Sequence, residues 1–272
     1  MSNLRKLVYP YLLWMTVLVL LPTILVLVLS ISDLEIFNLG PFSFNLDSFE
    51  FLTKPKVINA TINSIKFSFL STFVCFLIGY PVAYFLANIK SRHKTFYVSL
   101  LIIPVWSNML LRIIAWEKLF FPVSILNMFG ISFDLIGTDF AIIIGMVSMY
   151  LPFMILPIYS VLEKMDPSII EASKDLGANE FTTFYKVVFP LSISGVVSGT
   201  IMTLLPSMTA FALPERLGAG KIQLIGNVIE EYFMKTNDIN AGSLISIILM
   251  IIIVVMFVII LRFDKEGETL IW

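Results

Sequence analysis

Charged residues are scarce in this sequence. They make up 14% of its 272 residues, whereas an ordinary globular domain carries roughly 25%, and 58% of the residues are hydrophobic. A chain with so little charge is not expected to be soluble, which excludes an ordinary globular protein. Acidic and basic residues almost balance, at a net charge of −1, so the sequence gives no indication of nucleic-acid binding.

Cysteine and histidine are almost absent as well. Cys75 is the single cysteine, which excludes an internal disulfide and predicts a small buried side chain. His93 is the single histidine, and its neighbours Lys90, Arg92 and Lys94 predict a solvated loop. One residue of each type cannot build the usual metal sites or His-activated nucleophiles. We therefore expect neither a metal site nor a membrane enzyme.

Ionisable residues are missing from six long apolar stretches. A bilayer core about 30 Å thick requires about 20 apolar residues per helical span. The expected spans are 8–31, 66–89, 96–116, 140–162, 188–213 and 241–261. Lys66 lies at the edge of the second, and Arg112 in the third is expected to extend to the outer interface. The sequence thus predicts a single all-α domain over residues 1–272 with six transmembrane helices, and a surface segment at 119–133.

The spans also lack the carboxylates and histidines with which secondary carriers commonly relay protons or ions. A nucleotide site is missing too: Gly220-Lys221 is followed by Ile222, and Glu215 occupies the position of the first glycine of a P-loop. If ATP drives transport, another polypeptide has to bind it with magnesium, and this chain needs no cofactor. A carrier or channel that works without ATP is the alternative.

Basic residues indicate how the spans are oriented. Lys90, Arg92 and Lys94 crowd the second connection, and such residues concentrate on the cytoplasmic side of a membrane. We therefore place this connection in the cytoplasm, which puts both termini and the fourth connection, 163–189, there too. The first, third and fifth connections are then external.

The fourth connection contains strong helix start and stop signals. Asp166 can cap a helix that begins at Pro167, and Gly177 can end it in a left-handed conformation. The apolar stripe of this helix consists of Ile169, Ala172 and Leu176. A second helix is predicted over 180–189, with Pro190 near the membrane entry. The pattern indicates a helical hairpin that either docks on another protein or lies on the lipid surface.

The residues of this connection resemble a known motif. Glu171-Ala172, Gly177, Val187 and Phe189-Pro190 resemble the EAA loop of bacterial ABC importer permeases, with Ser173 in place of the usual second alanine and Phe189 in place of leucine. The resemblance implies the type I (MetI-like) permease fold and a coupling helix that docks on an ATPase subunit. The coupling residues that it implies are Ile169, Glu171, Ala172, Leu176, Gly177 and Pro190.

Further stretches, spread over most of the chain, resemble permeases of spermidine/putrescine importers of the PotB type. They are Gly79-Tyr80-Pro81 with Ala83-Tyr84, Ile103 to Asn108 with Arg112, Tyr150 to Phe153, and Leu224 to Asn227. The resemblance implies a multi-pass protein of the bacterial cytoplasmic membrane that imports polyamines with a second permease, two ATPase subunits and an extracytoplasmic substrate-binding protein. Related permeases handle ferric iron or other small solutes, so the substrate stays open.

A polyamine is a flexible polycation, and aromatic faces could line its path through cation–π contacts. The expected path residues are Trp106, Asn108, Tyr150 and Phe211, with packing or lipid contact as the alternative role. The acidic residues expected at the external entrance are Glu117, Glu230, Glu231 and Asp238, unless they are ordinary solvated charges. Gly195 and Gly199 allow close helix packing, within the bundle or at a subunit interface that lines the path. Residues 223–234 are expected to form a short external helix that braces the bundle or meets the binding protein.

Overall fold

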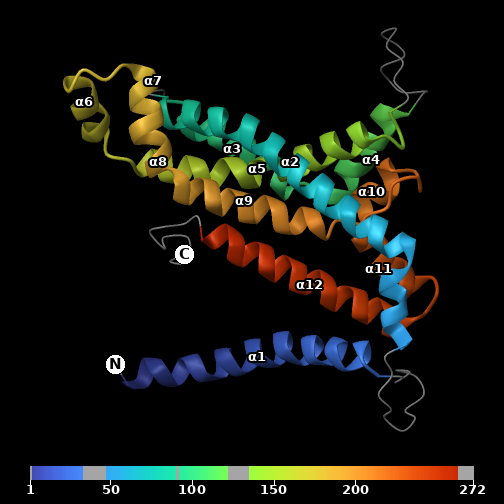
Figure 1. Cartoon of the computed structure of the whole chain (residues 1–272). Coiled ribbons are helices and arrows are strands. Elements are labelled where there is room, and N and C mark those ends of the chain that lie inside the picture. The colour runs from blue at the N-terminus through green and yellow to red at the C-terminus, as the bar shows by residue number, and fades with distance from the viewer. Residues whose placement is uncertain (1, 33–46, 90–91, 122–134, 263–272) are drawn as a thin grey trace. The chain divides into compact units, whose positions relative to one another are not determined.

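The computed structural model describes residues 2–32, 47–89, 92–121 and 135–262, and within these ranges every regular element is helical (Figure 1). The elements are α1 (Ser2–Ser30), η1 (Asp47–Thr53), α2 (Pro55–Asn88), α3 (Lys94–Trp106), α4 (Met109–Phe120), α5 (Asp139–Lys164), α6 (Pro167–Asp175), α7 (Glu180–Thr183), η3 (Phe184–Val188), α8 (Phe189–Leu191), α9 (Ile193–Met208), α10 (Ala212–Leu217), α11 (Ile225–Met234) and α12 (Ile239–Leu261). The surface segment predicted at 119–133 lies mostly outside the described residues.

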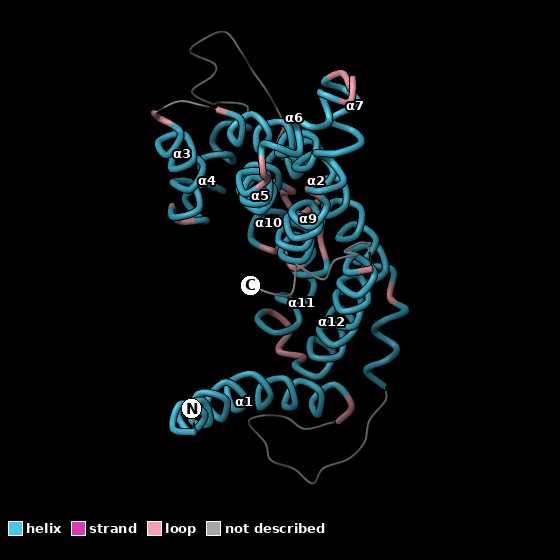
Figure 2. Tube along the Cα trace, turned by 90° about the vertical axis from the view of Figure 1, so that its left-hand side faces the viewer, coloured by secondary structure: helices cyan, strands magenta, loops and turns pink. Residues whose placement is uncertain are grey.

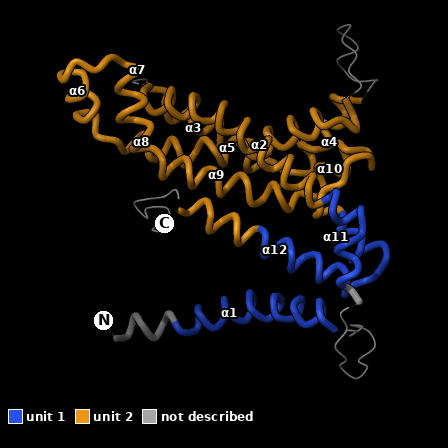
Figure 3. Tube along the Cα trace, in the orientation of Figure 1, with its two compact units in different colours: residues 1–60, 228–252 blue, residues 61–227, 253–272 orange. Residues whose placement is uncertain are grey.

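The chain divides into two compact units, which Figure 3 shows in different colours. Unit 1 comprises residues 1–60 and 228–252, and unit 2 comprises residues 61–227 and 253–272. Helices α2, α11 and α12 cross from one unit to the other, so the division runs through helices rather than through a linker.

Four helices are long and apolar enough to cross a membrane by themselves. They are the Tyr9–Ser30 part of α1, and the whole of α2, α5 and α12. Two further candidates are bent pairs of helices: α3 with α4, and residues 180–191 with α9. If each pair is one span, the number of candidate spans is six. The described residues thus provide four to six candidate spans at the places where the sequence predicts them.

The bent pairs correct the prediction of continuous helices in the third and fifth spans. Helices α3 and α4 meet at 90°, because Ser107 and Asn108 have extended backbones. The Asn108 side chain then accepts hydrogen bonds from two backbone N–H groups in the first turn of α4, at 2.9 and 3.4 Å, and so starts a new helix. In the fifth span the chain bends by 60° at Ser192, and α9 ends at Met208, before the predicted end at 213.

Helix α5 is the centre of unit 2, with α3, α4, α9 and α10 packed against it (Figure 2). Gly195 and Gly199 lie where α9 meets α5. A side chain at Gly199 would come within 2.9 Å of the Met154 sulfur and 3.0 Å of the Met154 carbonyl oxygen, and one at Gly195 within 3.0 Å of the Pro157 carbonyl oxygen. The two glycines therefore permit a close helix contact inside this chain. Cys75 is fully buried in the same core, as predicted.

In unit 1, η1 and the beginning of α2 pack against α11. The rings of Phe51 and Tyr232 meet edge to face at 5.5 Å, and Lys56 forms an ion pair with Glu231. Helix α11 occupies most of the external helix predicted at 223–234. In contrast, α1 leaves its apolar side chains exposed along nearly its whole span, of which 6% is buried. So large an apolar surface requires lipid or another protein against it.

Candidate functional site

The first helix of the fourth connection has the start and stop that its sequence predicts. The Asp166 carboxylate accepts a hydrogen bond from the Ser168 N–H at 2.9 Å, and Pro167 occupies the first helical position. This hydrogen bond holds the pKa of the Asp166 carboxyl below its ordinary value. At the other end Gly177 has a φ of +82°, which glycine adopts without strain, and its N–H donates to the Lys174 carbonyl at 2.9 Å. The helix is therefore fixed at both ends by local chemistry.

The two faces of α6 have different surroundings. On the inner face Ile170 packs against the core of unit 2, and the Ser173 hydroxyl lies 3.1 Å from the hydroxyl of the buried Thr183. On the outer face Leu176 is 90% exposed and Ile169 is 41% exposed. The other expected coupling residues are exposed as well: Glu171, Ala172, Gly177 and, in α8, Pro190. The apolar stripe of α6 thus has no cover within the described part of this chain.

The second half of the connection is helical without a gap from residue 180 to 191, as predicted for 180–189, but its middle is not α-helical. Asn179 caps α7 by accepting a hydrogen bond from the Thr182 N–H at 2.8 Å, but the chain then passes through the π-helical segment η3 before the short α8, which contains Pro190. Phe181 and Tyr185, one α-helical turn apart, are 77% and 65% exposed. Their i, i+4 spacing was the available signal for this second apolar surface, which sequence reasoning missed.

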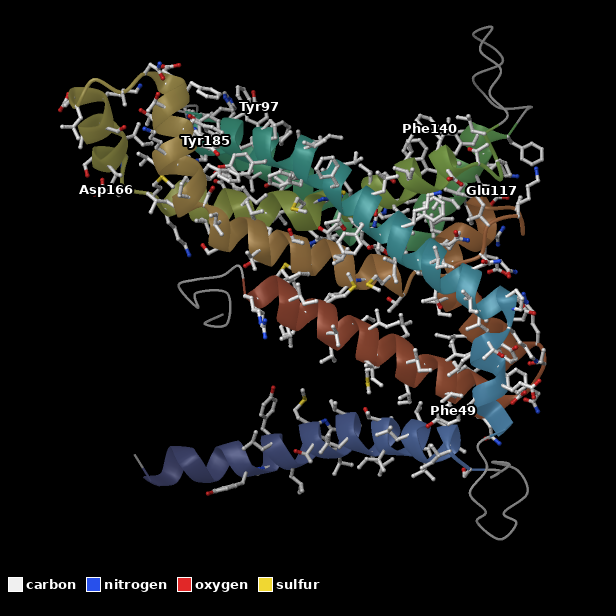
Figure 4. The ribbon with its side chains drawn as sticks, viewed as in Figure 1. Phe49, Tyr97, Glu117, Phe140, Asp166 and Tyr185 are labelled. Carbon is white, nitrogen blue, oxygen red and sulfur yellow. The ribbon has the colours of Figure 1, made fainter. Side chains whose placement is uncertain are left out.

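The loop lies at one end of unit 2, where Figure 4 labels Asp166 and Tyr185, whereas Glu117 lies at the opposite end. A further contact near the loop was not predicted from the sequence. Lys94, at the start of α3, forms a 3.1 Å ion pair with Glu163 at the end of α5 and donates to the Ala87 carbonyl at 3.1 Å. One ammonium group therefore connects the ends of α2, α3 and α5 beside the loop. His93 is exposed next to it, as predicted.

Three of the four expected path residues lie at two helix breaks, and Tyr150 lies within α5. Trp106, which is 86% exposed, and Asn108 flank the 90° break between α3 and α4. Phe211 is half-exposed between α9 and α10, and its carbonyl accepts a hydrogen bond from Asn227 at 2.7 Å. Tyr150 is buried and points its hydroxyl to the Pro206 carbonyl, 3.3 Å away in the last turn of α9. Both breaks put non-helical backbone beside an aromatic side chain.

Arg112 lies one turn into α4, and the extension of its side chain to the outer interface stays a prediction. It is half-buried. Its Nε and Nη1 atoms are buried, and no hydrogen-bond partner for them exists among the residues that the structure describes.

Most of the expected entrance carboxylates already have a structural contact. Glu117 pairs with Arg216 at 3.4 Å, and Glu231 pairs with Lys56. An oxygen of Asp238 accepts a hydrogen bond from the backbone N–H of Ala241 at 3.0 Å and so caps α12. Glu230 is half-exposed beside them in sequence. In the described part of the chain, no three His, Cys, Asp or Glu side chains are positioned to hold a metal ion.

The sequence matches known transport proteins over most of its length. Residues 76–266 match the family described as the binding-protein-dependent transport system inner membrane component. The spermidine/putrescine transport system permease protein PotB of Haemophilus influenzae is 34% identical over 259 residues, which cover 93% of this chain and 91% of that protein. The protein of the same description in Escherichia coli K12 is 32% identical, with 93% of this chain and 94% of that protein covered.

Two solved structures have the same fold. A bacterial alginate ABC transporter, in complex with an alginate pentasaccharide-bound periplasmic protein, matches with a TM-score of 0.79 over 98% of this chain and 95% of that chain, at 12% identity. A chain of the inward-facing methionine ABC transporter MetNI matches with a TM-score of 0.58 over 82% of this chain and 98% of that chain, at 16% identity. At such low identities, these likenesses concern the fold alone.

Proposed function

This chain belongs to the family of binding-protein-dependent transport system inner membrane components, and from this we propose that it is a permease subunit of an ATP-driven polyamine importer. It is a multi-pass protein of the inner membrane. The substrate class is proposed from sequence identity: the chain is 32% and 34% identical, over 93% of its length, to two permeases of spermidine/putrescine transport. The match extends over nearly the full length of both relatives, so it concerns the whole subunit rather than one motif.

The proposed subunit crosses the membrane six times, in the type I (MetI-like) arrangement, with both termini in the cytoplasm. Each bent pair then counts as one span, added to the four uninterrupted helices. The loop with Asp166 and Tyr185 at one end of unit 2, and Glu117 at the other, supports opposite sides of the membrane for connections four and three. The density of basic residues around Lys94 supports the cytoplasmic side for the loop.

Several partners belong to the proposal. A second, homologous permease would form the other half of the translocation path, two ATPase subunits would bind ATP and magnesium, and an extracytoplasmic protein would deliver the substrate. The uncovered stripe of α6, which includes the 90% exposed Leu176, supports docking of an ATPase there. The exposed apolar side chains of α1 support a contact with lipid or the second permease.

Transport follows from coupling between these partners. A loaded binding protein docks outside, ATP closes the ATPase dimer, and the loop passes that movement to the membrane helices, which open outward and receive the substrate. Hydrolysis resets the inward-facing state. The binding protein and the ATPase subunits therefore each shift the same equilibrium, between the outward-facing and the inward-facing arrangement of the membrane helices. This chain has a non-catalytic role, since the residues that hydrolyse ATP are on the ATPase subunits.

The helix breaks are the proposed lining of the path. In lipid, non-helical backbone is tolerated only where it is buried in protein or lines a water-filled cavity. We therefore assign the break at Trp106 and Asn108 and the break at Phe211, with Tyr150 beside it, to the path, where their aromatic faces would attract ammonium groups. At the entrance, Glu230 is the proposed attractor, because Glu117 and Glu231 are already in ion pairs.

The test is purification of the chain with its native partners, followed by reconstitution in lipid. We expect a copurifying ATPase whose hydrolysis rate rises with the loaded binding protein, together with ATP-dependent uptake of labelled spermidine or putrescine. A strain that lacks the chain should lose this uptake. Uptake without ATP would support a secondary carrier instead, and ATP-driven uptake of another solute would remove the polyamine assignment alone.

A further inference from the structure

Five aromatic side chains join α2 to the last part of the fourth connection, η3 and the start of α8. They are Phe76, Tyr80 and Tyr84 in α2, Phe184 in η3 and Phe189 in α8. Tyr80 is at their centre: its ring centroid lies 5.8 Å from Phe76, 5.7 Å from Phe184 and 5.6 Å from Phe189. These separations are within the range in which aromatic pairs attract each other. The segment η3–α8 is thus packed directly on one residue of α2.

The Tyr80 hydroxyl adds a directed contact to this packing. It lies 2.7 Å from the Ser192 hydroxyl, which in turn donates to the Phe189 carbonyl at 2.9 Å. Serine has one hydroxyl hydrogen and a carbonyl oxygen can only accept, so Tyr80 is the donor to Ser192. Ser192 is fully buried and Tyr80 is 5% exposed, so no bulk water competes for this chain of two hydrogen bonds.

Ser192 is also the residue at which the backbone changes direction by 60°, between α8 and α9. Just before it, the Phe189 N–H donates to the Phe184 carbonyl, a π-helical bond that marks a widened turn, and such turns are frequent at functional positions. Just after it, Gly195 holds α9 closely against α5. The bend therefore lies between the loop, which has to move, and a helix that is packed into the core of unit 2.

We propose that Tyr80 is a positioning residue for energy coupling: its hydroxyl ties α2 to the bend at Ser192, so that displacement of the loop moves α2 and α9 together. The inference rests on the proposed function and deepens it, because it assigns part of the coupling to a residue outside the loop. Without the Tyr80–Ser192 hydrogen bond, displacement of the loop changes the angle at Ser192 and leaves α2 and α9 in place. ATP is then hydrolysed without a matching movement of the membrane helices.

Tyr80→Phe is a suitable test variant, because it keeps the ring contacts and removes only the O–H donor. Ser192 keeps its hydrogen bond to the Phe189 carbonyl, so the bend itself retains its local support. Tyr84→Phe is the matched control: its ring also packs on Phe184, at 5.4 Å, but its hydroxyl is outside the Tyr80–Ser192 pair.

The measurement is spermidine taken up per ATP hydrolysed by the reconstituted transporter, with its binding protein present. We expect Tyr80→Phe to lower this ratio about fivefold, the shift that loss of one buried hydrogen bond gives in a two-state equilibrium. Ser192→Ala, which also removes the hydrogen bond to the Phe189 carbonyl, should lower it at least as far. The double variant should lower it no further than Ser192→Ala, because the Tyr80–Ser192 contact is then already lost. A purely structural role would lower the melting temperature but leave uptake per ATP unchanged, and that result would overturn the proposal.

A second measurement separates this inference from the assigned substrate. If the wild-type transporter imports neither spermidine nor putrescine, the polyamine assignment fails. The role of the Tyr80–Ser192 contact is then tested by hydrogen exchange of the full chain in lipid. Tyr80→Phe should speed exchange of the amides of residues 189–196 about fivefold, whereas Tyr84→Phe should not. Equal exchange rates in Tyr80→Phe and wild type would contradict the proposed role of the Tyr80–Ser192 hydrogen bond, whatever the substrate is.

Discussion

Ser173 in α6 and Thr183 in α7 share a hydrogen bond, with their hydroxyl oxygens 3.1 Å apart. Thr183 is buried, so this contact fixes the angle between the two helices of the loop at its inner side. On the same side Ile170 packs against the core, whereas the stripe of Ile169, Ala172 and Leu176 is exposed. A serine at this place, where EAA loops usually have a second alanine, therefore has a structural role here.

Ser173→Ala should loosen the loop without unfolding the membrane helices. The buried Thr183 hydroxyl loses its partner, which costs about 1 to 3 kcal/mol of local stability. Hydrogen exchange of residues 167–183 in lipid should accelerate accordingly, while the neighbouring Thr182→Ala leaves it near the wild-type rate. Identical exchange in both variants would mean that Ile170 packing alone holds the hairpin.

Gly177→Ala and Gly177→Asp test the left-handed turn after α6. No atom lies within 4 Å of the place where a Cβ would be, so the expected effect comes from the backbone, whose φ of +82° is unfavourable for residues other than glycine. Alanine should lower binding-protein-stimulated ATP hydrolysis partly, by roughly fivefold for a strain of about 1 kcal/mol. Aspartate, which also adds a charge beside the docking stripe, should abolish it.

Gly220→Ala is the matched control for this turn. Its φ is +73° and it too has open space, but it lies in the connection between α10 and α11. It should carry a similar strain and leave stimulated hydrolysis near the wild-type rate. An equal loss in both glycine variants would argue that backbone strain, rather than the position of Gly177 in the loop, causes the defect.

Leu176→Asp should detach the ATPase. Burial of an unpaired carboxylate under a docked protein costs several kcal/mol, so the affinity of the permease for the ATPase subunit should fall at least about tenfold. Because Leu176 is 90% exposed, the melting temperature of the permease alone should stay unchanged. Ser168→Asp, on the same helix but outside the stripe, is the control. Binding in detergent or lipid, measured with purified subunits, decides the outcome.

Asp166 should make the start of α6 sensitive to acid. Its pKa is lowered in the folded loop by the Ser168 N–H, so its stabilising effect is complete above its unfolded pKa of about 3.9 and is lost as the pH falls through the folded value. Asp166→Asn keeps a side-chain acceptor for the cap and removes the titrating group. Amide exchange of residues 167–170, corrected for intrinsic rates, should therefore rise below about pH 4 in the wild type alone.

Local sequence signals predicted the loop better than they predicted the spans. Asp166, Pro167 and Gly177 act on neighbouring backbone groups, so their caps and turn follow from residue type alone. Proline shows the limit of the same approach. Pro81 and Pro152 lie inside unbroken helices, whereas the third span breaks at Ser107, three residues after Pro104. The same residue type therefore has different outcomes, depending on what packs against the helix.

Two contacts between distant residues near the loop were also beyond local reasoning. Tyr80 and Ser192 are 112 residues apart, and Lys94 and Glu163 come from different helices, so no spacing rule connects them. Exposed aromatic residues such as Tyr185 were visible as a helical pattern, but their exposure depends on what the rest of unit 2 covers.

The sequence by itself determined that this chain is a helical membrane protein with a capped helical loop. Span length, charge and capping depend on a residue and its near neighbours, which is why they could be predicted. Only the tertiary structure decided where the spans bend, that η3 is π-helical, and which face of α6 stays uncovered. Those features depend on contacts between distant residues, such as Ser173 with Thr183 and Gly199 with Met154, which form only when the helices pack.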